Sequence, residues 1–211
     1  MRIAISGTHA SGKTRLIDDY CALRPDTLKL GDPFEFLETA SDPPGPSEYL
    51  AQLQIAERRL HGLSPDTDWI IERTPLDFLA YLDALEALGR TPTSPGPPSP
   101  EAYLSTIRSQ VDFLVLLPLE YRDDVVVAAD EDPELRIAMN DALFTLVDSF
   151  SLANTDRVVE ITGPPETRLA RLLAEVEGRR GEAPAFAPEV GNVTPVQTAE
   201  DRFSEQRLQG S

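Results

Sequence analysis

The sequence predicts an α/β fold in which a five-stranded parallel sheet is flanked by helices on both faces. Three observations lead to this prediction. Short apolar segments alternate along the chain with longer segments of helical periodicity. A glycine-rich loop directly follows the first apolar segment and opens the first helical one. Several helical segments begin with a capping residue followed by proline, a combination that marks where a helix starts.

Five short segments rich in apolar residues are expected to be strands. The fourth gives the strongest signal, because it is a continuous apolar run after Asp112 and such runs are typical of strands buried on both faces. The expected strands are residues 2–6, 27–30, 68–71, 111–117 and 157–161.

The segments between these strands are expected to be helices. The second helix is predicted to have Ser47 as its N-cap. Thr74, Pro75 and Asp77 combine a cap, a proline at the first position and an acid at the third, which predicts a helix that ends at Gly89. The expected helices are residues 13–22, 47–60, 74–88, one that opens at residues 99–100, 133–150 and 164–176.

Composition bounds the domain organisation. The chain has 211 residues, of which 41% are hydrophobic, so one domain can bury an adequate core without disulfides or structural metals. Residues 91–100 are dense in proline, serine and glycine, which predicts a loop. From residue 178 the composition shifts to proline, alanine, glycine and charge. We therefore expect a globular domain over residues 1–177 and a flexible tail over residues 178–211.

Charge and cysteine content bear on partners and location. The net charge of −17 makes nucleic acid an unfavourable partner, because the phosphates would be repelled. The single cysteine, Cys21, excludes an intrachain disulfide and fits a reducing compartment. The longest apolar stretch, residues 113–119, is far too short to cross a bilayer. We expect a cytoplasmic protein with a small-molecule partner, no membrane or nucleic-acid partner, and a homodimer as one allowed assembly.

The glycine-rich loop carries the clearest functional signal. Its residues match G-x-x-x-x-G-K-[ST] at every fixed position, the pattern of a Walker A phosphate loop. Backbone N–H groups in such a loop point at phosphate oxygens, Lys13 adds a positive charge, and Thr14 offers a hydroxyl to Mg²⁺. We therefore expect an NTP-binding protein that uses ATP and Mg²⁺. The expected nucleotide-binding residues are Gly7, Thr8, His9, Ala10, Ser11, Gly12, Lys13 and Thr14.

Charged residues at the ends of later strands extend the candidate site. Ligands of parallel sheets sit at the carboxyl ends of strands, where Asp32 follows the second strand and Glu72 and Arg73 follow the third. Both strands are expected beside the strand that leads into the phosphate loop. A carboxylate there can accept a proton or hold Mg²⁺, and an arginine can neutralise phosphate charge. Three of these assignments stay open: Asp32 against an ordinary Asp-Pro turn, Glu35 as a replacement for Asp32, and Asp77 as a capping partner of Thr74 only.

The fourth strand end is followed by an acidic stretch that contains Arg122 and Arg136. These arginines are candidates for phosphate contacts, and pairing with their acidic neighbours is an equal alternative. The expected catalytic residues are Lys13, Asp32, Glu72, Arg73, Arg122 and Arg136. The expected metal-binding residues are Thr14 and Glu72.

Together, two segments resemble a known family. The run from Ile5 to Thr14 and the run Ile-Ile-Glu-Arg-Thr-Pro-Leu-Asp after the third strand are similar to the P-loop kinases of nucleosides and nucleotides. Nicotinamide riboside kinase-like ATPases and deoxynucleoside kinases are the nearest likeness, over roughly residues 1–177. The resemblance implies that the phosphate-loop strand is central in the sheet. It also implies that Asp32 is the base for the accepting hydroxyl, and that residues 120–136 form a lid that supplies Arg122 and Arg136.

The sequence therefore predicts a kinase that transfers the γ-phosphoryl group of ATP to a hydroxyl of a small molecule, such as a nucleoside or a related metabolite. Two alternatives remain at this stage. One is a regulatory ATPase that hydrolyses ATP slowly without an acceptor. The other is a kinase acting on modified bases in DNA, which the negative charge disfavours.

Overall fold

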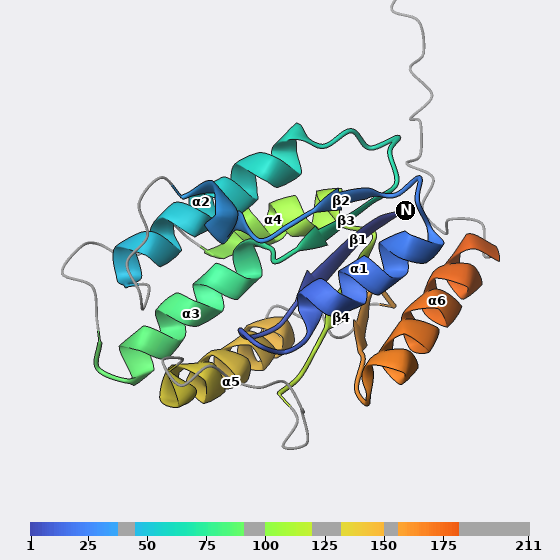
Figure 1. Cartoon of the computed structure of the whole chain (residues 1–211). Coiled ribbons are helices and arrows are strands. Elements are labelled where there is room, and N and C mark those ends of the chain that lie inside the picture. Colours follow the sequence, from blue (N-terminus) through green and yellow to red (C-terminus); the bar gives the residue numbers. More distant parts are fainter. Residues whose placement is uncertain (38–44, 91–99, 120–131, 150–155, 182–211) are drawn as a thin grey trace, which may run out of the picture. The chain divides into compact units, whose positions relative to one another are not determined.

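A computed structural model of the protein describes residues 1–37, 45–90, 100–119, 132–149 and 156–181. Within these residues, five strands form one sheet in the order β2-β3-β1-β4-β5, and all neighbouring strands are parallel (Figure 1). The α/β class and the five-stranded parallel sheet are confirmed, and β1 is central. The strands are β1 (Arg2–Ser6), β2 (Leu28–Leu30), β3 (Trp69–Glu72), β4 (Phe113–Leu116) and β5 (Val158–Glu160).

Helices connect the strands, and each of them except the first begins with proline. Proline suits the first helical position because its fixed φ fits the helix and its missing N–H would have no partner there. A short 3₁₀ helix, η1 (Pro33–Phe36), follows β2 and was not predicted. The α-helices are α1 (Lys13–Leu23), α2 (Pro46–Gly62), α3 (Pro75–Ala87), α4 (Pro100–Gln110), α5 (Pro133–Ser149) and α6 (Pro165–Gly181).

The hydrophobic core lies mainly on one face of the sheet. Helices α2, α3, α4 and α5 pack there, and α3 contacts the other three. Side chains alternate along β1: Ala4 belongs to this cluster, whereas Ile3 and Ile5 are buried outside it. Helix α1 contacts β1 and β3 and borders a groove shared with α6. Helices thus cover both faces, and the carboxyl ends of the strands lie at one edge.

Three local expectations are wrong. Strand β2 does not lie beside β1, because β3 lies between them. Strand order depends on how each helix crosses the sheet, which local sequence does not specify. Ser47 is not the N-cap of α2: the helix begins one residue earlier, at Pro46, with Gly45 as the cap. Glu72 does not follow β3 but is its last residue.

The last helix is longer than expected. Helix α6 continues to Gly181 instead of ending at about Val176, and residues 182–211 lie outside the described residues. Residues Met1–Glu175 form one compact unit that contains the whole sheet. The expected loop at residues 91–99 also lies outside the described part of the chain. No helix in the described part is both long and apolar enough to cross a membrane.

Candidate phosphate-binding and catalytic site

The phosphate loop runs from the end of β1 to the start of α1. The register of β1 with the strands on its two sides shows what lies beside the loop: Ile5 pairs with Glu72 of β3, and Ser6 pairs with Leu116 of β4. Gly7 has φ 155°, and a Cβ there would lie 2.7 Å from the carbonyl oxygen of Leu117. Gly12 is left-handed with φ 86° and caps α1. The two fixed glycines of the motif are therefore required by a close backbone approach and by a left-handed turn.

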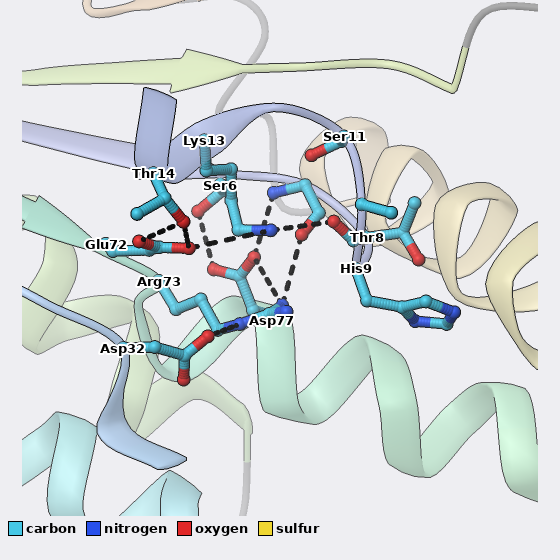
Figure 2. Close-up of polar contacts among 12 residues, drawn as sticks. Ser6, Thr8, His9, Ser11, Lys13, Thr14, Asp32, Glu72, Arg73 and Asp77 are labelled. Carbon is cyan, nitrogen blue, oxygen red and sulfur yellow. Dashed lines mark hydrogen bonds and ion pairs between the residues drawn. The ribbon is translucent and has the colours of Figure 1, made fainter. Parts of the chain in front are cut away.

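Lys13 is buried beneath the loop, with a side chain that is 3% exposed. Its Nζ donates a hydrogen bond of 2.7 Å to the carbonyl oxygen of Thr8 and lies 3.9 Å from Oε1 of Glu72. Burial, together with the positive charge of Arg73, lowers the pKa of Lys13 from 10.5 to about 8. The ammonium is thus held beside the loop, with a neighbouring carboxylate that partly offsets its burial (Figure 2).

Glu72 and Thr14 meet at the start of α1. The Thr14 hydroxyl lies 3.0 and 3.2 Å from the two Glu72 carboxylate oxygens and donates to them. Burial raises the pKa of Glu72, whereas the charges of Lys13 and Arg73 lower it. A hydroxyl and a carboxylate are oxygen ligands of the kind Mg²⁺ prefers, and Mg²⁺ usually takes only one or two carboxylates plus phosphate oxygens and water. Within the described residues, no group of three or more histidine, cysteine or acidic side chains could hold a metal ion. The Thr14–Glu72 pair fits Mg²⁺ that is held jointly with a nucleotide.

Arg73 connects the end of β2 to the phosphate loop. Its Nε donates to Oδ2 of Asp32 at 2.6 Å, and its Nη1 donates to the carbonyl oxygen of Gly7 at 3.1 Å. The residue has φ 64°, a left-handed conformation that is unfavourable for a side chain of this size. The guanidinium also lies 5.4 Å above the ring of Tyr81. Because backbone strain of this kind persists only where surrounding contacts fix it, these contacts indicate a positioned functional residue.

Asp32 is held by two hydrogen bonds. Its Oδ1 accepts from the backbone N–H of Phe34 at 3.0 Å, so it caps η1, and its Oδ2 accepts from Arg73. Burial acts to raise the pKa of Asp32, but the Arg73 charge and these hydrogen bonds hold it below its ordinary value. Asp32 is therefore an ionised carboxylate at neutral pH. Glu35 is exposed, and its carboxylate folds back over Gly31.

Asp77 has a wider role than the expected cap. The capping box with Thr74 is confirmed, since the Asp77 carboxylate accepts from the Thr74 backbone N–H at 2.8 Å. The same carboxylate accepts from the Ser6 hydroxyl at 2.6 Å and from the Gly7 backbone N–H at 2.9 Å. Asp77 is fully buried, and it ties the first residue of the phosphate loop to the start of α3.

His9 lies on the α3 side of the loop, directed away from Lys13 (Figure 2). Its backbone N–H donates to the Tyr81 hydroxyl at 3.0 Å, and its Nδ1 lies 3.0 Å from the same oxygen. Tyr81 in turn stacks on Tyr49 at 4.4 Å between ring centroids. Burial lowers the pKa of the His9 imidazole from 6.5 to about 4, and the cationic side chains of Arg73 and Lys13 add to the shift. His9 is therefore neutral at pH 7.

Arg136 reaches the loop from α5. It donates from Nε to the His9 carbonyl oxygen at 3.2 Å and from Nη2 to the Ala10 carbonyl oxygen at 3.0 Å. Arg136 thus lies at the phosphate loop, and both of these hydrogen bonds go to backbone carbonyls of the loop. Arg122, the other arginine expected in a lid, lies outside the described residues.

Comparison with solved structures identifies the fold. Deoxyadenosine kinase from M. mycoides, with dCMP and dCDP bound, is 13% identical with a TM-score of 0.56, over 85% of this chain and 100% of that chain. Thymidylate kinase from Candida albicans is 13% identical with a TM-score of 0.60, over 84% of this chain and 91% of that chain. The fold is that of a P-loop nucleoside or nucleotide kinase. NadR protein in complex with NR shares it, at 16% identity and a TM-score of 0.57, over 86% of this chain and 52% of that chain.

Sequence comparisons add no closer relative to this P-loop kinase fold, because no protein-family model and no curated protein matches the chain. The likeness therefore rests on structure.

The structure brings most of the predicted site residues together at the carboxyl edge of the sheet. Lys13, Thr14, Asp32, Glu72 and Arg73 gather there, and Arg136 approaches from α5. The structure also adds two residues that the sequence did not indicate, Tyr81 and Arg168, and it gives Asp77 a wider network than a helix cap. Arg168, in the first turn of α6, donates to the carbonyl oxygen of Ser11 at 2.7 Å. No local pattern in the sequence indicated this contact.

Proposed function

We propose that the protein is a Mg·ATP-dependent kinase that transfers the γ-phosphoryl group to a hydroxyl of a small molecule. One observation carries this proposal: the Arg73 guanidinium bonds both Asp32, at 2.6 Å, and the Gly7 carbonyl of the phosphate loop, at 3.1 Å. A nucleotide-binding loop needs neither contact to hold phosphates. The two contacts suit a kinase, because they fix a carboxylate beside the loop, where an acceptor must be held in line with the transferring group.

In this proposal the roles follow from the contacts. The loop amides and Lys13 hold the phosphates, and Thr14 and Glu72 hold Mg²⁺, which neutralises charge that develops during transfer. Asp32 accepts a hydrogen bond from the acceptor hydroxyl and takes its proton late in the reaction. A carboxylate of lowered pKa can take this proton, because the hydroxyl becomes strongly acidic once its oxygen has begun to bond to phosphorus.

The arginines complete the proposed charge balance. Arg73 lies between the acceptor carboxylate and the loop, so it can stabilise the transferring phosphoryl group without moving far. Lid arginines supply charge to the phosphates in the family that the sequence resembles. We propose that role for Arg122, whereas Arg136 acts on the loop through the carbonyls of His9 and Ala10. The similarity in fold to kinases of nucleosides and nucleotides supports a nucleoside or a related metabolite as the acceptor in this proposal. A cytoplasmic location suits such a substrate.

A regulatory ATPase without an acceptor is the second candidate. The Thr14–Glu72 pair is compatible with it, since the two ligands that we propose for Mg²⁺ do not include Asp32. The test that separates the two is ATP consumption measured with a panel of nucleosides, nucleoside monophosphates and other hydroxylated metabolites. We expect at least one acceptor to raise turnover tenfold or more. Slow hydrolysis that no acceptor stimulates would favour the regulatory ATPase.

A further inference from the structure

Five consecutive carbonyl groups of the phosphate loop accept hydrogen bonds from cationic side chains. Arg73 bonds the carbonyl of Gly7 and Lys13 bonds that of Thr8. Arg136 bonds the next two carbonyls, those of His9 and Ala10, and Arg168 bonds that of Ser11. Side chains from four parts of the fold thus reach the backbone of one loop: the residue after β3 and the helices α1, α5 and α6.

These bonds fix the direction of the loop amides. In a trans peptide the carbonyl of one residue and the N–H of the next point in opposite directions. With the carbonyls of residues 9 to 11 turned toward Arg136 and Arg168, the N–H groups of Ala10, Ser11 and Gly12 face away from these guanidiniums. Ala10 and Gly12 are both left-handed, at φ 50° and φ 86°, which is the backbone geometry of an anion-binding concavity.

Arg168 has the most specific geometry of these groups. Its side chain is 4% exposed, its Nη1 lies 2.7 Å from the Ser11 carbonyl oxygen, and a Cβ on Gly12 would lie 3.0 Å from the same nitrogen. The guanidinium therefore fills the space that the second fixed glycine of the motif leaves open. A positive charge bonded to a carbonyl also polarises the peptide and makes its N–H a stronger donor.

We propose that Arg168 is a positioning residue of the phosphate loop. It holds the Ser11–Gly12 peptide so that the Gly12 N–H stays directed at a nucleotide phosphate, and it acts through the backbone without touching the nucleotide. The inference rests on the proposed nucleotide binding. It assigns a role to a residue outside the Walker A sequence, on a helix more than 150 positions away along the chain.

The test compares Arg168 with an arginine one turn along the same helix. Arg171 is exposed, and within the described residues its Nη1 bonds the Thr162 hydroxyl at 3.5 Å. Arg171→Met therefore removes the same charge from α6 without changing a contact to the phosphate loop. Binding of Mg·ADP is measured by calorimetry. We expect Arg168→Met to weaken binding by about 10- to 100-fold, the effect of losing a charged hydrogen bond. The affinity of Arg171→Met for Mg·ADP should stay within about twofold of the unmodified protein. The affinity of Arg168→Lys should lie between those of the two methionine variants, because lysine keeps the charge but lacks the planar guanidinium group.

Hydrogen–deuterium exchange of the protein without nucleotide gives the second readout. The amides of residues 8–13 should exchange faster in Arg168→Met than in Arg171→Met, while β3 and α3 exchange alike in both. If Arg168→Met does not fold, the same comparison is made between Arg168→Lys and Arg171→Lys. Unchanged loop exchange together with unchanged Mg·ADP affinity overturns the positioning role. Wild-type protein that binds no Mg·ADP overturns the proposed function, and the exchange result still decides the role of Arg168.

Discussion

Asp32 and Arg73 form an ion pair of 2.6 Å that joins the end of β2 to the end of β3. Because Arg73 also bonds the Gly7 carbonyl of the phosphate loop, this ion pair predicts that Asp32 is the base for the acceptor hydroxyl. Asp32→Asn keeps the size of the side chain but cannot take a proton. We expect acceptor turnover to fall by about 10²–10⁴-fold, the usual worth of general-base assistance, with the KM for ATP nearly unchanged.

Glu35→Gln is the matched control for that variant. Glu35 lies three residues after Asp32, on η1, and is exposed. The Glu35→Gln variant should therefore turn over the acceptor within about twofold of the unmodified protein. A collapsed rate in Glu35→Gln alongside normal turnover in Asp32→Asn would move the base to Glu35. Normal turnover in both variants would count against a kinase.

Lys13 and Lys29 are the two lysines of the chain, and they differ completely in environment. Lys13 is buried beside the phosphate loop, whereas Lys29 forms an exposed ion pair with Asp18. Lys13→Ala should abolish measurable ATP turnover while the protein stays folded, since it removes the main charge expected on the β- and γ-phosphates. Lys29→Ala should be nearly silent, and circular dichroism verifies folding of both. A folded Lys13→Ala variant with normal turnover would refute the Walker A assignment.

Glu72 and Thr14 should determine the metal requirement. Glu72→Gln weakens one oxygen ligand, so we expect saturation at about tenfold higher Mg²⁺ concentration as well as a lower rate. Thr14→Val should have a similar effect, because it is isosteric but lacks the hydroxyl, while Thr14→Ser should retain the metal dependence. A titration of activity against Mg²⁺ at saturating ATP measures this. Metal curves that coincide for Glu72→Gln and Asp32→Asn would show that the two carboxylates do not divide these roles.

Asp77 is expected to matter for stability as well as activity. Asn at this position could not accept from the Ser6 hydroxyl, the Gly7 N–H and the Thr74 N–H together. We expect Asp77→Asn to lower the free energy of unfolding by about 2–4 kcal/mol, since it leaves buried donors without a partner and weakens a helix cap. Asp83→Asn makes the same change at an exposed position of α3 and should cost little. Urea denaturation measures both variants, and an equal cost in the two would contradict a stabilising role for the Asp77 network.

His9 predicts a pH dependence of stability. Its pKa of about 4 in the folded protein lies below the ordinary 6.5, so between these values the unfolded chain binds more protons than the folded one. The free energy of unfolding should therefore fall as the pH is lowered from about 6.5 toward 4. His9→Gln should lose less stability over this window, and carboxylates that titrate near pH 4 affect both proteins alike. Denaturation at pH 7 and pH 5 makes the comparison, and equal losses would place the His9 pKa near its ordinary value.

Local patterns in the sequence predicted most of the fold. Alternating periodicity and helix caps predicted the five strands and six α-helices that the described residues contain, because these signals are local. Gly7 to Thr14 and Glu72-Arg73 were recognised for the same reason: their spacing within one segment carries the chemistry. The start of α2 was misplaced because Pro46 and Gly45 form a better start than Ser47, and only the chain path into the helix decides between them.

The features that were missed depend on contacts between distant segments. The Arg168–Ser11 bond joins residues 157 positions apart, and no pattern around either residue announces it. Strand order is of the same kind, since nothing near β2 indicates that β3 separates it from β1. The charged capping residue Asp77 was recognised in its local role, and its bond to Gly7, 70 positions away, was not.

The left-handed backbone at Arg73 has a mechanical consequence. A non-glycine residue in that region costs about 1–2 kcal/mol, and here the bonds to Asp32 and Gly7 hold it in place. If either bond breaks, the other must hold the strained backbone alone, so the residue tends to relax and withdraw from both partners. Arg73 is therefore a single mechanical link between the end of β2 and the phosphate loop, and a displacement of Asp32 would be felt at Gly7.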